Sequence, residues 1–212
     1  MLLVIGNRNY SSWSLRPWLV LRQAEIPFDE VVVPLFQPGT AAELRRHSPV
    51  GKVPVLKDGD LTVWDSLAIC EYVAEKFPDR KLWPSEASVR AVARSVVAEM
   101  HAGFTALRTE MPMNIRLRRK KELSEAAERD VARVEAMWAE LRMKHGKRGP
   151  FLFGDFSVAD AFYAPVATRF MTWGVTLSGA AAEYQKTVLG LPAMGEWMDL
   201  ALKEPWTEPR YD

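Results

Sequence analysis

Two adjacent serines near the start of the chain stand where side-chain hydroxyls do chemistry. Ser11 and Ser12 directly precede apolar residues at helical spacing between positions 14 and 24. Serine is favoured at a helix N-cap because its oxygen accepts from unpaired first-turn N–H groups. The same hydroxyl could donate to a bound thiolate. Such a bond is worth ~1.5–3 kcal/mol and the helix N-terminus adds ~0.3–1 kcal/mol, which matches the ~2.7 kcal/mol needed to lower a thiol pKa by about two units.

A second segment, residues 51–66, suits the binding of an extended peptide. Pro54 follows Val53 at the start of a predicted strand, and a proline there belongs at a sheet edge because it lacks a ladder donor. A cis peptide bond would turn the backbone N–H and C=O of Val53 outward to pair with a peptide. The dipeptide alone favours the trans form, because X-Pro bonds are cis only about 5–6% of the time.

Asp65 and Ser66 begin the next predicted helix. We expect Ser66 to be its N-cap, and first-turn N–H groups also form an anion site. The carboxylate of an amino acid would then lie on Ser66 and these amides while Asp65 binds its ammonium group. The pair predicts a two-point clamp for a free amino-acid end.

Composition excludes several classes of protein. The 212 residues include 28 Lys+Arg and 27 Asp+Glu, a net charge of +1, so no global field attracts nucleic acid or an anionic membrane. A single cysteine, Cys70, excludes an internal disulfide framework and a thiolate zinc site. The N-terminus lacks a signal-peptide pattern, and no apolar run reaches the ~18 residues of a membrane span. We expect a cytoplasmic protein with no metal.

Hydrophobic periodicity divides the chain into two predicted domains. Strands at 2–5, 28–33, 53–56 and 61–64 alternate with helices at 14–24, 40–47 and from Ser66 to Pro78, with Asp58-Gly59 marking a hairpin. This β-α-β-α-β-β-α order predicts an α/β, thioredoxin-like domain over residues 1–78. After a polar linker at 79–86, the pattern is helical: 87–117, 123–145, 157–173 and 192–203, with a further segment near 180–188. Residues 87–212 are therefore predicted to form an all-α domain.

These segments resemble the glutathione transferase family, serine type, nearest its zeta-like bacterial branch. The matching pieces are Tyr-Ser-Ser-Trp-Ser-Leu-Arg, Ser-Pro-Val-Gly-Lys-Val-Pro-Val-Leu, Trp-Asp-Ser-Leu-Ala-Ile-Cys-Glu-Tyr and Gly-Asp-Phe-Ser-Val-Ala-Asp-Ala, in family order. The last contains Ser157 and Asp160, which are spaced as a capping box. The resemblance covers nearly the whole chain and implies the two-domain glutathione transferase fold.

The resemblance also implies where glutathione binds as a co-substrate. Ser11 would face the sulfur, with Ser12 as the near alternative. The remaining contacts would come from Val53 and cis Pro54 to the cysteinyl part, Asp65 and Ser66 to the γ-glutamyl end, and Lys52, with Gln37 or Thr40, to the glycyl carboxylate. Tyrosine-type members of the family carry their catalytic tyrosine at the end of the first strand, and this chain has Asn7 at that position. Tyr10 is therefore a weaker candidate, and we expect it to have a packing role.

A second substrate would lie between the domains, over the start of the first helix. Its candidate contacts are Trp13, Met100, His101, Phe104, Arg108, Met111 and Met113, each with core packing as the alternative. A Met-rich wall would suit a broad apolar substrate, and Arg108 could orient an anionic one.

Trp13 stands where the zeta pattern has cysteine, and this departure argues against zeta-type cis-trans isomerisation without excluding it. The resemblance implies a homodimeric transferase that adds glutathione to a small, mostly apolar electrophile. The alternatives are a glutathione-dependent isomerase similar to maleylacetoacetate isomerase, or a binding protein without catalysis.

Overall fold

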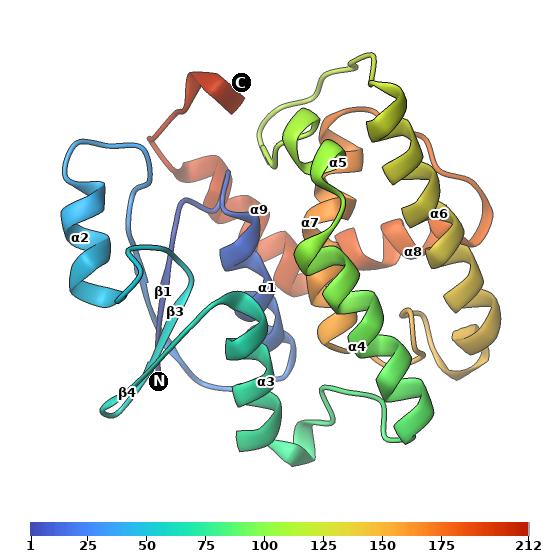
Figure 1. Cartoon of the computed structure of the whole chain (residues 1–212), viewed down its shortest axis with the longest axis horizontal. Helices are drawn as coiled ribbons and strands as arrows, with labels where there is room; N and C mark the ends of the chain where they lie inside the picture. Colours follow the sequence, from blue (N-terminus) through green and yellow to red (C-terminus); the bar gives the residue numbers. More distant parts are fainter. Residues whose placement is uncertain (212) are drawn as a thin grey trace.

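A four-stranded mixed sheet is the centre of the N-terminal domain in the computed structural model, which describes residues 1–211 (Figure 1). Its strands are β1 (Leu2–Ile5), β2 (Asp29–Val32), β3 (Val55–Asp58) and β4 (Leu61–Trp64), in the order β2-β1-β3-β4. Strand β1 is parallel to β2 and antiparallel to β3. The β3–β4 hairpin turns at Gly59, whose φ is 59°, a conformation that glycine adopts without steric cost. The α/β domain and the hairpin are as predicted.

Helices cover both faces of this sheet. In β1 the side chains alternate, so Leu3 and Ile5 join the main core beneath α1 (Ser12–Gln23) and α3 (Ser66–Lys76). Val4 points the other way and packs with Leu44 of α2 (Thr40–His47). Figure 1 shows α2 on one side of the strands and α1 with α3 on the other.

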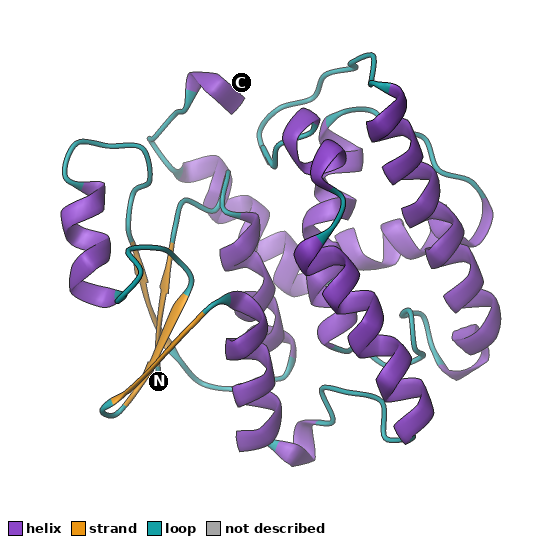
Figure 2. Ribbon diagram, in the orientation of Figure 1, coloured by secondary structure: helices purple, strands orange, loops and turns teal. Residues whose placement is uncertain are grey.

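The rest of the described chain is helical (Figure 2). A short 3₁₀ turn, Pro78–Arg80, leads to α4 (Ala87–Ala102), α5 (Thr105–Glu110), α6 (Glu125–His145), α7 (Val158–Thr172), α8 (Gly179–Leu189) and α9 (Pro192–Lys203), with further 3₁₀ turns at Gly146–Arg148 and Pro209–Tyr211. Helix α7 is almost completely buried and packs against α1, α4 and α8, so it joins the two domains. No helix within residues 1–211 is long and apolar enough to cross a membrane.

The single helix predicted over 87–117 is wrong. Helix α4 ends at Ala102, and Gly103 caps it where an added Cβ would lie 2.7 Å from the Glu99 carbonyl oxygen. Phe104 then takes a positive φ of 53° and starts α5, which ends before Pro112. The apolar spacing continues through the break because both helices turn buried side chains to the same core, so periodicity alone does not detect the break.

Two predicted boundaries near prolines also differ. Helix α1 begins at Ser12 and not at residue 14, so Pro17 lies in its second turn. Strand β3 begins at Val55 and not at residue 53, because Pro54 has no N–H to donate to the sheet.

The predicted capping box at the start of α7 is present. Asp160 is completely buried, and its carboxylate accepts from the backbone N–H groups of Leu152 (3.0 Å) and Ser157 (2.8 Å) and from the Tyr184 hydroxyl (3.0 Å). Burial raises the pKa of Asp160 to about 6. The side chain thus ties α7, α8 and the preceding loop together.

We predict that Asp160→Ala lowers the free energy of unfolding by about 3 kcal/mol, because it leaves several buried donors without an acceptor. The pKa of Asp160 in the folded state lies above the ordinary 3.8, so protonation of its carboxyl group stabilises the fold. This contribution to the free energy of unfolding is fully present below about pH 3.8 and is lost as the pH rises through about 6. The loss in the variant should therefore be larger at about pH 5 than at about pH 8. Urea denaturation at both pH values measures it.

Asp199→Ala is the matched control, because Asp199 is exposed on α9. It should unfold with the wild-type midpoint. Equal stability of Asp160→Ala and Asp199→Ala would contradict the structural role of the buried carboxylate.

Candidate functional site

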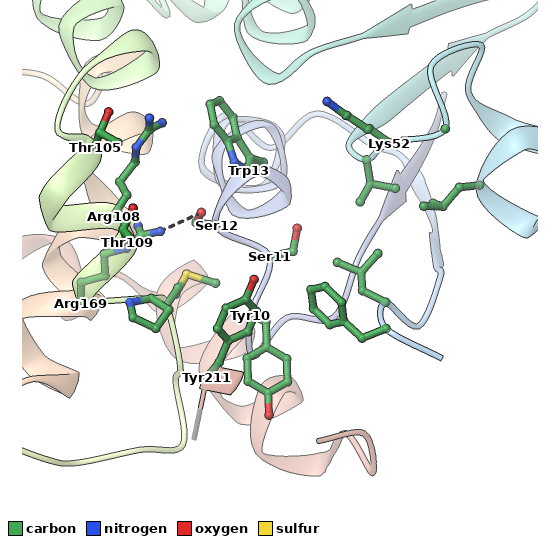
Figure 3. Close-up of a pocket in the computed structure, with 17 residues that line it drawn as sticks. Tyr10, Ser11, Ser12, Trp13, Lys52, Thr105, Arg108, Thr109, Arg169 and Tyr211 are labelled. Atoms are coloured by element: carbon green, nitrogen blue, oxygen red, sulfur yellow. Dashed lines mark hydrogen bonds between the residues drawn. The ribbon is translucent and has the colours of Figure 1, made fainter. Parts of the chain in front are cut away.

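A cavity of about 650 Å³ lies between the two domains, over the start of α1 (Figure 3). It is lined by residues from the turn before α1, the β2–α2 connection, the segment before β3, α5, α7 and the C-terminal segment. These are Tyr10, Ser11, Ser12, Trp13, Leu35, Phe36, Leu44, Gly51, Lys52, Val53, Thr105, Arg108, Thr109, Pro112, Met113, Arg169 and Tyr211. Both serines of the predicted pair are among them.

Ser11 is the N-cap of α1, as its position in the sequence predicts. Its Oγ accepts from the backbone N–H of Ser14 at 3.4 Å and donates to Ser14 Oγ at 2.7 Å. Ser14 Oγ in turn accepts from the N–H of Gly6 at 3.0 Å. The Ser11 hydroxyl is therefore engaged within the first turn of the helix.

Ser12 is held differently. Its Oγ accepts from Nη2 of Arg169, on α7, at 3.1 Å, and Figure 3 shows this bond crossing from one domain to the other. Among residues 1–211, no hydrogen bond uses the hydroxyl hydrogen of Ser12. That hydrogen is free to point into the cavity, toward a negatively charged atom.

Three arginines, Arg16, Arg108 and Arg169, surround the start of α1 with positive charge. Burial, followed by the neighbouring Arg169 charge, lowers the pKa of Arg16 to about 9. Burial, followed by Arg108, lowers the pKa of Arg169 to about 9. In the part of the chain that the structure describes, none of the three takes part in an ion pair. Buried charges without a partner are costly, so the cluster indicates a site for an anion.

Trp13 forms a wall between this cavity and a smaller one. The Arg16 guanidinium stacks between the rings of Trp13 (4.2 Å to the centroid) and Phe162 (4.4 Å). The smaller cavity, about 310 Å³, is lined by Trp13, Val50, Lys52, Val53, Pro54, Trp64, Asp65 and Ser66. The peptide bond between Val53 and Pro54 is cis. The segments 9–18 and 51–66 thus meet, and Trp13 and Lys52 line both cavities.

The expectation that Ser66 caps α3 is wrong, because Asp65 is the N-cap. One Asp65 carboxylate oxygen accepts from the N–H of Leu67 at 2.8 Å, while the other lies 3.3 Å from Nε2 of His101. Ser66 is completely buried and its Oγ accepts from Arg16 Nη1 at 3.4 Å. Asp65 has φ 74° and ψ 136°, an uncommon backbone conformation for a residue with a side chain.

The other predicted glutathione contacts divide into two groups. Lys52 lines both cavities. Gln37 and Thr40 line neither, and the Thr40 hydroxyl is used locally, accepting from the Gln37 N–H (3.0 Å) and donating to the Pro34 carbonyl (2.6 Å). This bonding fixes the turn before α2 and leaves no free hydroxyl hydrogen for a ligand.

Of the predicted second-substrate residues, Trp13, Arg108 and Met113 line the larger cavity. Met100, Phe104 and Met111 pack in the hydrophobic core and do not line this cavity. His101 contacts the edge of Trp13 with ring centroids 5.1 Å apart. Burial lowers its pKa, so its ring favours the neutral form.

Arg169, Tyr211 and the two threonines of α5 were not predicted from the sequence. One signal for Arg169 exists: it is a lone basic residue in a helix that is otherwise almost entirely apolar, and charged residues are rarely buried without a purpose. Tyr211 gave no signal, since it reaches the cavity from the end of the described chain and packs against Tyr10, with ring centroids 5.7 Å apart. Within residues 1–211, no three His, Cys, Asp or Glu side chains are grouped to hold a metal ion.

Comparisons with known proteins agree on one family. The models described as glutathione S-transferase, N-terminal domain and C-terminal domain match residues 10–76 and 124–200. Glutathione S-transferase hmp2 of Hypomyces subiculosus is 26% identical over 200 residues, 90% of each chain.

Solved structures show the same fold. A Burkholderia glutathione transferase homolog with bound glutathione has a TM-score of 0.71 and 21% identity, over 95% of this chain and 97% of that one. A bacterial zeta-class maleyl pyruvate isomerase has a TM-score of 0.72 and 20% identity, over 98% and 100%. With both domains matched by family models, the chain belongs to the glutathione transferase family.

Proposed function

We propose that this protein is a glutathione transferase that stabilises the thiolate of glutathione with a serine hydroxyl and adds it to a small electrophile. The main observation that supports this proposal is the pair of buried serines at the N-terminus of α1, which face the cavity between the domains. The bond from Arg169 to Ser12 supports this role, because a hydroxyl that accepts from a cation becomes a stronger donor.

Ser12 is the better-placed donor of the two. Its hydrogen is free, whereas Ser11 already donates to Ser14 and must rotate before it binds a ligand. The resemblance to the family implied that Ser11 faces the sulfur, but the local hydrogen bonds favour Ser12. One charge-assisted hydrogen bond of ~1.5–3 kcal/mol lowers a thiol pKa by about one to two units.

The smaller cavity suits the peptide part of glutathione. Val53 borders it just before β3 begins, where a strand edge is available for backbone pairing. Asp65 keeps a half-exposed carboxylate that would bind the γ-glutamyl ammonium group. Lys52 would meet the glycyl carboxylate from the opposite wall.

The reaction needs no cofactor beyond this co-substrate. The thiol proton leaves to solvent, and the sulfur forms a bond to an electrophilic carbon. The carbon then releases a leaving group as an anion, or, in an activated alkene, the neighbouring carbon takes up a proton. The protein contributes pKa lowering and positioning.

A glutathione-dependent isomerase is the second candidate. The similarity to a protein named maleyl pyruvate isomerase favours it. In an isomerisation the sulfur adds to a double bond and leaves again, so the thiol is regenerated.

We predict that Ser12→Ala raises the thiol pKa of bound glutathione by about one to two units, toward about 8.5, because it removes the donor. Ser11→Ala should raise this pKa less and should lower helix stability by about 1 kcal/mol, since it removes the N-cap. Ultraviolet titration of the bound thiolate measures both pKa values.

Ser88→Ala is a control, because Ser88 is at the exposed start of α4. It should leave the titration unchanged. An ordinary thiol pKa in the wild-type complex would contradict the catalytic proposal, and a larger effect of Ser11→Ala would reverse the assignment of the two serines.

We also predict that Arg169→Met raises the bound thiol pKa by about one unit, whereas Arg169→Lys keeps most of the shift. The methionine removes a positive charge behind Ser12, and the lysine retains it. The same ultraviolet titration, with circular dichroism to verify the fold, separates electrostatic loss from unfolding. Identical titrations of Arg169→Met and the wild type would rule out a role for the charge.

Counting free thiol distinguishes the two reactions. We expect thiol to disappear in step with the electrophile, because conjugation consumes one glutathione per turnover. Turnover with constant free thiol would instead identify the isomerase.

A further inference from the structure

Within residues 1–211, the charged side chains that line the larger cavity are all of one sign. Lys52, Arg108 and Arg169 are its charged lining residues, and no Asp or Glu is among them. Arg16 lies directly behind Trp13 and adds a further buried positive charge. Asp65, whose charge partly opposes the lowering of the Arg16 pKa, borders the other cavity. The net field in the larger cavity therefore favours a negative ligand.

Glutathione alone leaves part of this cluster without a negative partner. Under the proposed function, its thiolate lies at the serines, closest to Arg169, and its glycyl carboxylate lies at Lys52, so neither is assigned to Arg108. Each of the three Arg169 guanidinium nitrogens already donates a hydrogen bond, to Ser12, to the Met111 carbonyl (2.9 Å) and to the Pro165 carbonyl (3.3 Å). Arg108 is only partly engaged: its Nη1 donates to the His101 carbonyl at 3.3 Å, and the side chain is partly exposed to the cavity.

Arg108 also has suitable polar neighbours. Thr105 precedes Arg108 by three residues and Thr109 by four on α5, so it neighbours both on the helix surface, and all three line the cavity. Figure 3 shows the two threonines and Arg108 on one wall, across from Lys52. A guanidinium fork with two hydroxyls matches a planar carboxylate. Trp13, Pro112 and Met113 supply an apolar surface beside it.

We propose that the second substrate is an electrophile that carries a carboxylate, which Arg108 binds together with Thr105 and Thr109 while its apolar body packs on Trp13 and Met113. This inference rests on the proposed function, and it replaces the mostly apolar electrophile expected from the sequence. It assigns Arg108 to substrate selection, whereas Arg169 acts on the thiolate through Ser12.

Two product analogues test the inference without requiring turnover. S-(carboxybenzyl)glutathione carries the added carboxylate, and S-(carbamoylbenzyl)glutathione is its neutral counterpart of the same shape. We expect calorimetry to show the acid binding the wild-type protein about tenfold more tightly than the amide, because only the acid forms a charge-assisted pair. Arg108→Gln should reduce this ratio to about twofold or less, and Arg108→Lys should give an intermediate ratio.

Arg129→Gln is the matched control, because it removes one positive charge from an exposed position on α6. It should keep the tenfold ratio. Equal affinities of the two analogues for the wild type, or an unchanged ratio in Arg108→Gln, would overturn the inference while leaving the proposed function intact. If neither analogue nor glutathione itself binds, both proposals are wrong.

Discussion

The buried turn before α1 is the constraint on which the site depends. Its backbone N–H groups are removed from water, so each needs a partner. Glu204 accepts from the N–H groups of Arg8 (2.8 Å) and Asn9 (3.2 Å), and the Asn9 side chain donates to Asn114 at 3.0 Å. These partners come from the helical domain and the C-terminal segment. The conformation of the turn that presents the serines therefore depends on hydrogen bonds from the helical domain and the C-terminal segment.

Helix α7 has the same integrating role on the other side of the cavity. Its capping box fixes its start through Asp160, and its buried surface packs against α1. The helix therefore delivers Arg169 to Ser12 across the domain boundary. The energetic cost of burying that guanidinium is offset in part by three hydrogen bonds, and a bound anion would offset more of it.

Local patterns predicted much of the fold. The Asp58-Gly59 hairpin, α2 at 40–47 and the capping box were predicted because each depends on turn chemistry or periodicity within a few residues. The helix at 87–117 was wrong because the break at Gly103 and Phe104 does not interrupt the apolar spacing. The N-cap of α3 is Asp65 and not Ser66, because both residue types are good N-caps and the completely buried Ser66 accepts a hydrogen bond from Arg16.

The sequence alone determined the family, the order of the elements and the meeting of two polar segments, since these follow from motifs and periodicity along the chain. The tertiary structure decided which hydroxyl is free, because that depends on Ser14 for Ser11 and on Arg169 for Ser12. It also decided the positive character of the cavity. A net charge of +1 gives no hint of it, because the field at a site depends on which few charges the fold brings together without partners.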